Sequence, residues 1–171
     1  MERIRTLFRE KRWFRWTVEG LVVVGLYLGV RAWQTHGTIA GPAPALDAEA
    51  LSGDAISLAA IRGEPVLVHF WATWCGVCRA EEGNVIAVAG DHRVLTVATR
   101  SGSPGDVAEY VRSAGFDAPV VLDPAGRIAA EWGVRSLPTS FVISPDGTIE
   151  NVEVGYTTEI GLRARLWLAS R

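Results

Sequence analysis

The chain has 171 residues, of which 49% are apolar, so it is long enough for one domain with a buried core and too apolar for intrinsic disorder. Its net charge of −2 combines two unequal parts: residues 1–45 carry seven Lys/Arg and three Asp/Glu (+4), and residues 46–171 carry ten Arg and sixteen Asp/Glu (−6). The acidic part argues against a nucleic-acid-binding domain, because phosphate binding needs a basic surface.

A basic segment and an apolar segment open the chain. Six Lys/Arg residues lie in residues 1–15, and an apolar stretch spans residues 13–33. About 20 residues of helix cross a bilayer, and Lys and Arg before the span favour a cytoplasmic N-terminus. The pattern predicts a cytoplasmic head (1–15), a single transmembrane anchor in the inner membrane (16–33) and a flexible linker (34–45) that is rich in small residues.

A cleaved signal peptide is the alternative for this segment. The nearest small-residue cleavage pattern is Ala43-Pro44-Ala45, well beyond the apolar run, and it contains a proline. Either interpretation places residues 46–171 on the periplasmic, extracytoplasmic side, where a dithiol meets protein disulfides.

Strand and helix patterns alternate through residues 46–171. Runs of β-branched and apolar residues predict strands at 66–72, 94–99, 120–122, 139–143 and 149–154. Helices are predicted at 76–89, 104–114, 128–132 and 158–169, the second of them capped by Ser103. A tight-turn sequence at 144–147 joins the last two strands in a hairpin. This order predicts an α/β domain with a central mixed sheet flanked by helices, and residues 46–62 should form a small strand and loop over the sheet.

The two cysteines, Cys75 and Cys78, lie three residues apart at the predicted start of a helix. They are too few for a disulfide scaffold or a four-ligand zinc site. At the helix N-terminus, free N–H groups and the helix dipole stabilise a thiolate on Cys75, which is the attacking species in disulfide exchange. Cys78, nearly one turn further on, can displace the resulting mixed disulfide. This reaction needs an unequal pair, so we expect Cys75 to be exposed and Cys78 to be sheltered.

The stretch FWATWCGVCRAEE at residues 70–82 resembles the active-site signature of thioredoxins. It is most similar to the membrane-anchored extracytoplasmic branch, which includes the TlpA- and ResA-type reductases, the cytochrome c maturation thioredoxins and the thioredoxin-like protein of suppressor-of-copper-sensitivity operons. The resemblance covers residues 46–171 and implies a thioredoxin fold. It also implies protein disulfide substrates and a membrane electron-transfer partner that supplies reducing equivalents.

A second match is Pro138, which stands where thioredoxins carry a cis-proline just before the first strand of their hairpin. The resemblance implies that Pro138 packs beside the two sulfurs and that the backbone of Leu137 pairs with an extended substrate. It also implies substrate contacts around these motifs. The expected contact residues are Trp74, Gly76, Val77, Leu137 and Thr139.

Two further residues fall at positions of interest in the resemblance. Glu81 matches a carboxylate that extracytoplasmic reductases often carry after the second cysteine, and a buried carboxylate there would carry the proton of the resolving thiol. The alternative is a solvated acid in the first turn of the helix. His69 replaces the buried aspartate of many cytoplasmic thioredoxins, and we interpret it as a core residue rather than a base.

The sequence therefore favours a thiol–disulfide oxidoreductase that acts as a reductase, which needs no cofactor or metal. One alternative is a copper-tolerance module in which the thiolates of Cys75 and Cys78 hold Cu(I). The third hypothesis is a structural domain with a permanent disulfide, which the reactive position of Cys75 disfavours.

Overall fold

The computed structural model describes residues 16–26, 29 and 41–171. The chain divides into two units, Met1–His36 and Gly37–Arg171. In the first unit, residues 16–26 are helical. Within the described residues, no helix combines the length and the apolar character needed to cross a membrane. The predicted head (1–15) and most of the predicted linker lie outside the described residues.

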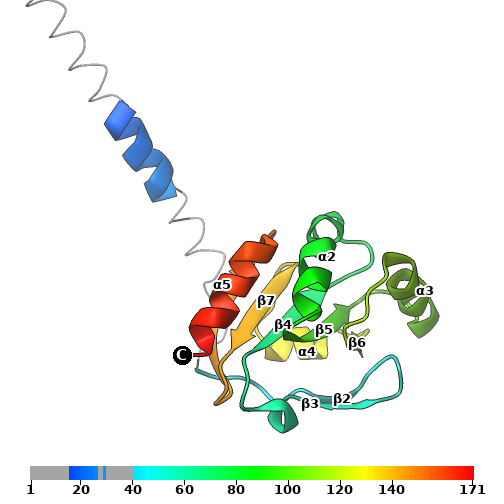
Figure 1. Cartoon of the computed structure of the whole chain (residues 1–171). Helices are drawn as coiled ribbons and strands as arrows, with labels where there is room; N and C mark the ends of the chain where they lie inside the picture. Colours follow the sequence, from blue (N-terminus) through cyan, green and yellow to red (C-terminus); the bar gives the residue numbers. More distant parts are fainter. Residues whose placement is uncertain (1–15, 27–28, 30–40) are drawn as a thin grey trace, which may run out of the picture. The chain divides into compact units, whose positions relative to one another are not determined.

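A six-stranded mixed sheet forms the centre of the second unit (Figure 1). β4, β5 and β6 are parallel, whereas β7, β8 and β1 run antiparallel to their neighbours. β4 lies inside the sheet and is buried at every position, as expected for a strand that is covered on both faces. The strands, in spatial order, are β1 (Gly41–Pro42), β8 (Thr148–Val154), β7 (Thr139–Ile143), β4 (Val66–Trp71), β5 (Arg93–Thr99) and β6 (Val120–Asp123).

Four helices and a small second sheet accompany the central sheet, close to the predicted ranges. The helices are α2 (Gly76–Ala89), α3 (Pro104–Ala114), α4 (Arg127–Glu131) and α5 (Glu159–Ala169). β2 (Asp47–Glu49) pairs with β3 (Ala55–Ser57), and the short 3₁₀ helix η1 (Leu58–Ile61) follows. The predicted cap of α3 is confirmed: the Ser103 hydroxyl accepts from the N–H of Asp106, and the Asp106 carboxylate accepts from the N–H of Ser103.

The core has two layers because successive side chains of a strand point to opposite faces. Leu67 and Trp71 of β4 belong to the cluster that α2, α3 and α5 cover. Val68 and Phe70 belong to the cluster on the other face, together with Trp132 at the end of α4. The Trp132 ring is fully buried and lies 5.6 Å from the ring of Phe70. Two covered faces make β4 a rigid support for the segment that follows it.

The structure differs from the sequence prediction at the end of the linker. Gly41 and Pro42 pair with β8, and the N–H of Ala43 donates to the carbonyl of Gly147 at 2.9 Å. Without this pairing, the outer edge of β8 would leave backbone groups open. The composition of residues 34–45 does not reveal this pairing, because glycine and proline are rare in strands.

Candidate active site

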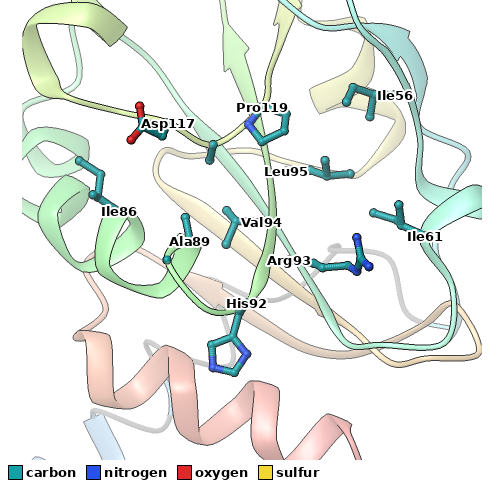
Figure 2. A pocket seen from close by; sticks show the side chains of 12 residues that line it. Ile56, Ile61, Ile86, Ala89, His92, Arg93, Val94, Leu95, Asp117 and Pro119 are labelled. Atoms are coloured by element: carbon teal, nitrogen blue, oxygen red, sulfur yellow. The ribbon is translucent and has the colours of Figure 1, made fainter.

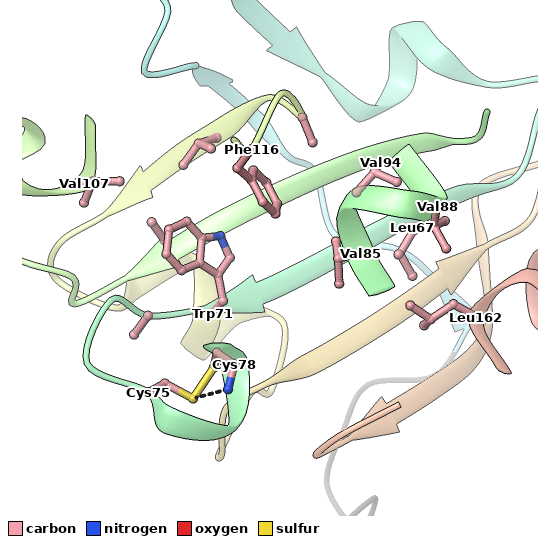
Figure 3. Close-up of a cluster of buried hydrophobic side chains, with 14 of the residues drawn as sticks. Leu67, Trp71, Cys75, Cys78, Val85, Val88, Val94, Val107, Phe116 and Leu162 are labelled. Atoms are coloured by element: carbon pink, nitrogen blue, oxygen red, sulfur yellow. Dashed lines mark hydrogen bonds between the residues drawn. A yellow bond between two sulfur atoms is a disulfide. The ribbon is translucent and has the colours of Figure 1, made fainter. Parts of the chain in front are cut away.

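Cys75 lies where the central strand gives way to α2. Its backbone is extended (φ −82°, ψ 108°), and it is the N-cap residue of the helix. The N–H of Cys75 donates to the carbonyl of Ala72, and the N–H of Arg79 donates to the carbonyl of Cys75. The first-turn N–H of Cys78 donates to the sulfur of Cys75 at 3.1 Å (Figure 3). The helix start therefore places a hydrogen-bond donor on the sulfur where a thiolate would develop negative charge.

Cys75 and Cys78 are joined by a disulfide, with their Cα atoms 5.2 Å apart. We expected an exposed Cys75 and a sheltered Cys78, but Cys75 is only 6% exposed and Cys78 4%. In this disulfide form the expected contrast in exposure is absent. The two residues differ in position instead: Cys75 caps the helix, whereas Cys78 lies within its first turn. Figure 3 shows both cysteines below the buried ring of Trp71.

Three hydrogen bonds hold the connection between β4 and α2 against the loop that follows β5. The N–H of Thr73 donates to the Ser101 hydroxyl at 3.2 Å, and the Thr73 hydroxyl donates to the Ser101 carbonyl at 3.1 Å. The Trp74 indole donates to the Arg100 carbonyl at 2.9 Å. These contacts fix the residues just before Cys75 against residues 100–101, which lie outside the cysteine motif.

The bond between Leu137 and Pro138 is cis, as the resemblance implied. Leu137 is half-buried and packs against the cluster that contains both cysteines. Among the described residues, neither the N–H nor the carbonyl of Leu137 has a hydrogen-bond partner, so both remain available to an extended segment. The carbonyl of Pro138, in contrast, accepts from the N–H of Gly155.

The other expected contact residues divide into two groups. Trp74, Gly76 and Val77 are exposed around the disulfide, with Trp74 63% and Val77 48% accessible. Thr139 is buried, pairs with strands on both sides and donates its hydroxyl to the Ser136 carbonyl. The structure therefore places the first three residues on the accessible rim and leaves Thr139 inside the sheet.

Glu81 is fully buried on α2, three residues beyond Cys78. The prediction of a solvated acid was wrong, and the buried carboxyl of the other prediction is confirmed. One carboxyl oxygen accepts from the N–H of Thr157 at 3.2 Å, and the other has no hydrogen-bond partner among the described residues. Burial raises the pKa of Glu81 to about 7, aided by the charge of Glu153 and opposed by the Thr157 hydrogen bond.

His69 is a buried core residue, as predicted. Its Nδ1 lies 2.8 Å from the hydroxyl oxygen of Ser140 on the neighbouring strand. Burial lowers the pKa of His69 to about 4, so the ring is neutral at physiological pH. His69 and Cys78 both line a hollow of about 10 Å³, which is barely large enough for one water molecule.

A larger hollow of about 570 Å³ lies at the other ends of the strands (Figure 2). Its lining includes Arg93 at the start of β5, Pro119 just before β6 and Ala89 at the end of α2. Cys75 follows the carboxyl end of β4, so this hollow takes no part in the thiol chemistry. Within the described part of the chain, no group of three or more His, Cys, Asp or Glu side chains is arranged to hold a metal ion.

Sequence reasoning did not find several residues around the cysteines. Ser101, Thr157 and Arg100 contact the motif from loops that are 26 to 76 residues away in the chain. No local pattern marks them, since their role depends on which loops the sheet brings together. A βα-loop position after β5 is the one signal that points to Arg100 and Ser101 in advance.

The sheet order, the disulfide at the start of α2 and the cis-proline loop together define a thioredoxin-like thiol–disulfide oxidoreductase. The comparisons with known proteins agree. Residues 39–152 match the model of the AhpC/TSA family, and the chain belongs to that family.

The chain is also similar to named relatives and to solved structures. A thioredoxin-like protein of Haemophilus influenzae is 35% identical over 121 residues, covering 70% of this chain and 72% of that protein. The thiol-disulfide oxidoreductase ResA of Bacillus subtilis is 34% identical over 121 residues, covering 68% of each chain. The crystal structure of the pneumococcal exposed lipoprotein thioredoxin Etrx1 of Streptococcus pneumoniae superposes with a TM-score of 0.65 at 26% identity, covering 73% of this chain and 99% of that chain.

Proposed function

We propose that this oxidoreductase reduces protein disulfides outside the cytoplasm, with Cys75 as the attacking residue and Cys78 as the resolving residue. The observation that carries the proposal is the Cys75 sulfur at the N-cap of α2, which accepts the N–H of Cys78 at 3.1 Å. This donor stabilises a thiolate on Cys75, and the thiolate is the attacking species.

Each reduction transfers two electrons from the Cys75–Cys78 dithiol to the substrate disulfide. The Cys75 thiolate attacks one sulfur of the substrate disulfide, so a Cys75–substrate bond forms and the other substrate cysteine leaves as a thiolate. The Cys78 thiolate then attacks the Cys75 sulfur, the Cys75–Cys78 bond forms and the second substrate cysteine leaves. The substrate gains two electrons and two protons. A membrane dithiol carrier returns two electrons to the pair.

Glu81 serves this cycle as the proton carrier of Cys78. Both residues lie on the same face of α2 because they are three positions apart. A carboxyl with a pKa of about 7 is close to evenly protonated near neutral pH, which suits a group that accepts and returns a proton.

Leu137 and the exposed rim bind the substrate. The N–H and carbonyl of Leu137 face no partner among the described residues, which supports strand-like pairing with an extended peptide. Trp74, Gly76 and Val77 provide the surrounding contact surface, and Pro138 shapes the loop.

The extracytoplasmic, membrane-anchored location is a further part of the proposal. It rests on the basic and apolar sequence of residues 1–33 and on the relation to a protein described as an exposed lipoprotein. In this division, residues 1–15 form the cytoplasmic head, residues 16–33 the anchor and residues 46–171 the redox domain. Alkaline extraction and protease digestion of intact spheroplasts test it: we expect the chain to stay in the membrane pellet with residues 46–171 digested. Release by alkali, or protection from protease, would contradict it.

Trapping tests the roles of the two cysteines. Cys78→Ser should accumulate a mixed disulfide between Cys75 and a disulfide-containing protein, because nothing displaces the substrate. Cys75→Ser should accumulate none. Intact-mass measurement distinguishes the two, and adducts on Cys78 in preference to Cys75 would reverse the proposed roles.

The copper-tolerance alternative uses the same two sulfurs in their reduced form. Titration of the reduced chain with Cu(I) against a competing chelator addresses it. Stoichiometric binding that depends on both thiolates would add this activity, whereas binding unchanged in Cys75→Ser would exclude a two-thiolate site.

A further inference from the structure

A small hollow lies beside Trp74, the residue before Cys75, between three loops and α4. It has a volume of about 200 Å³, which is below the roughly 300–1,000 Å³ of pockets that hold small-molecule ligands. Its size suits a side chain of a bound peptide. Trp74, which precedes Cys75, and Leu137, which precedes the cis-proline, both line it. A segment that pairs with Leu137 while its cysteine meets Cys75 would therefore pass the hollow.

The charged residues that line this hollow are all basic. They are Arg100 and Arg135, and no carboxylate belongs to the lining. Both arginines are exposed, and neither forms an ion pair with any residue that the structure describes. The nearby Asp123 does not neutralise them by pairing, because its buried carboxylate accepts from the N–H groups of Ile128 and Ala129 at 3.2 and 3.0 Å.

Arg100 is held in place by its surroundings. Its backbone has a positive φ of 50°, which is uncommon for a residue other than glycine. Its N–H donates to the carbonyl of Asp123, and its carbonyl accepts from the Trp74 indole. The guanidinium lies directly over Gly126, where an added Cβ would be only 2.6 Å from the Arg100 Nε. Glycine at position 126 therefore leaves the room that the Arg100 side chain needs. Arg100 lines the hollow together with Trp74, the residue before Cys75.

We propose that this hollow is a specificity pocket for a carboxylate side chain, and that the preferred substrates carry Asp or Glu within a few residues of the cysteine that Cys75 attacks. Two guanidinium groups that form no ion pair among the described residues line this concave surface. They favour a carboxylate by charge and by hydrogen-bond geometry. The preference is local. Residues 46–171 carry a net charge of −6, so the domain as a whole does not attract acidic proteins. This inference rests on the proposed attack by Cys75.

The test measures attack by Cys75 alone. The full-length Cys78→Ser chain, reduced and in a non-ionic detergent, reacts with short peptides whose single cysteine is activated as a 2-pyridyl disulfide. Cys75 forms a disulfide with the peptide and releases 2-thiopyridone, which is followed by absorbance. The peptides are matched and carry Asp, Asn or Lys two residues before or two residues after the cysteine.

We expect the Asp peptide to react about fivefold faster than the Lys peptide at low salt in one of the two positions, as for a single partly exposed charge pair. The ratio should fall towards one at about 0.5 M salt, because exposed charges are screened. Arg100→Gln and Arg135→Gln should each reduce the ratio, and the double variant should remove it. Arg112→Gln is the matched control: Arg112 is an exposed arginine in the last turn of α3, outside the hollow, and its loss should leave the ratio unchanged.

Circular dichroism of each variant checks that a lost preference does not come from unfolding. If Arg100→Gln fails to fold, Arg135→Gln provides the second variant, because Arg135 lies on an exposed loop. Equal rates for Asp and Lys peptides, a preference for Lys, or a preference that survives in the double variant would overturn the pocket while leaving the thiol chemistry intact. No reaction with any peptide would instead contradict the proposed attack by Cys75, and the pocket with it.

Discussion

The carboxyl group of Glu81 is buried on the helix that carries both cysteines, and its one hydrogen-bond donor among the described residues is the N–H of Thr157. Burial, together with a smaller contribution from the charge of Glu153, raises its pKa to about 7. Because the unfolded chain holds this carboxyl near a pKa of 4.5, folding takes up a proton between about pH 4.5 and 7. At the residue scale, the helix of the two cysteines therefore contains a group whose protonation changes near neutral pH.

Glu81→Gln should remove a pH dependence of stability. The raised pKa in the folded state means that Glu81 contributes fully below pH 4.5 and that the contribution is lost as pH rises through about 7. The loss in unfolding free energy is at most about 3–4 kcal/mol, at about 1.4 kcal/mol per pKa unit. Urea unfolding at pH 5 and pH 8 should show the variant gaining stability relative to the wild type at the higher pH. If the difference in unfolding free energy between the variant and the wild type did not change with pH, the raised pKa of Glu81 would be contradicted.

The same substitution should affect the cycle. If Glu81 carries the proton of Cys78, the rate of the resolving step in the wild type should show an inflection near pH 7. The Glu81→Gln variant should lose this inflection. Stopped-flow measurement of peptide release from a preformed Cys75 mixed disulfide provides the readout. An unchanged pH profile would leave Glu81 with a structural effect only.

Glu153→Gln should lower the pKa of Glu81. Glu153 is buried on β8, its carboxylate lies 2.6 Å from the guanidinium of Arg165, and its charge raises the pKa of Glu81. The decrease should be partial, since burial of Glu81 is the larger cause. NMR titration of the Glu81 side-chain carbon measures it, with the exposed Glu150 on the same strand substituted as a control. A pKa of Glu81 that stays the same or rises would show that the two carboxyls are not coupled.

At the scale of elements, the position of Cys75 depends on one loop holding another. Ser101 is buried after β5, accepts from the N–H of Thr73 and donates to the Thr99 carbonyl. The β4–α2 connection is therefore hydrogen-bonded to the β5–α3 connection.

Ser101→Ala should destabilise the fold by about 1–2 kcal/mol, because it leaves the N–H of Thr73 without its acceptor. Amide hydrogen exchange should also become faster at Thr73 than in the wild type. Ser52→Ala is the matched control, since that residue is exposed and its hydroxyl bonds only to Asp54 among the residues that the structure describes. If the two variants were equally stable and exchanged equally at Thr73, the hydrogen bonds between Ser101 and Thr73 would not stabilise the β4–α2 connection.

The elements could be predicted well from the sequence because their signals are local. The apolar run of β4, the serine cap of α3 and the turn between β7 and β8 each lie within a few residues of the structure that they specify. β1 could not be predicted, since two residues of glycine and proline become a strand only because the edge of β8 is next to them.

At the scale of the whole molecule, the same contrast applies to the site. Cys75, Cys78 and Pro138 were predicted from two motifs, and the burial of Glu81 was one of two open alternatives. The contact of Glu81 with Thr157 joins residues 76 positions apart, and the hollow beside Trp74 combines residues from four segments. Such features depend on the packed sheet, and a pattern along the chain does not specify them.

The reduction potential of the Cys75–Cys78 pair tests the central claim most directly. The full-length chain is equilibrated with a series of glutathione or dithiothreitol ratios, and the fluorescence of Trp71 and Trp74 near the pair reports the oxidised fraction. We expect a value well below the glutathione range, near the roughly −270 mV of thioredoxin, as a reductase needs. A value near about −120 mV would make the protein an oxidant and contradict the proposed direction, and a pair that does not cycle at all would contradict the oxidoreductase function itself.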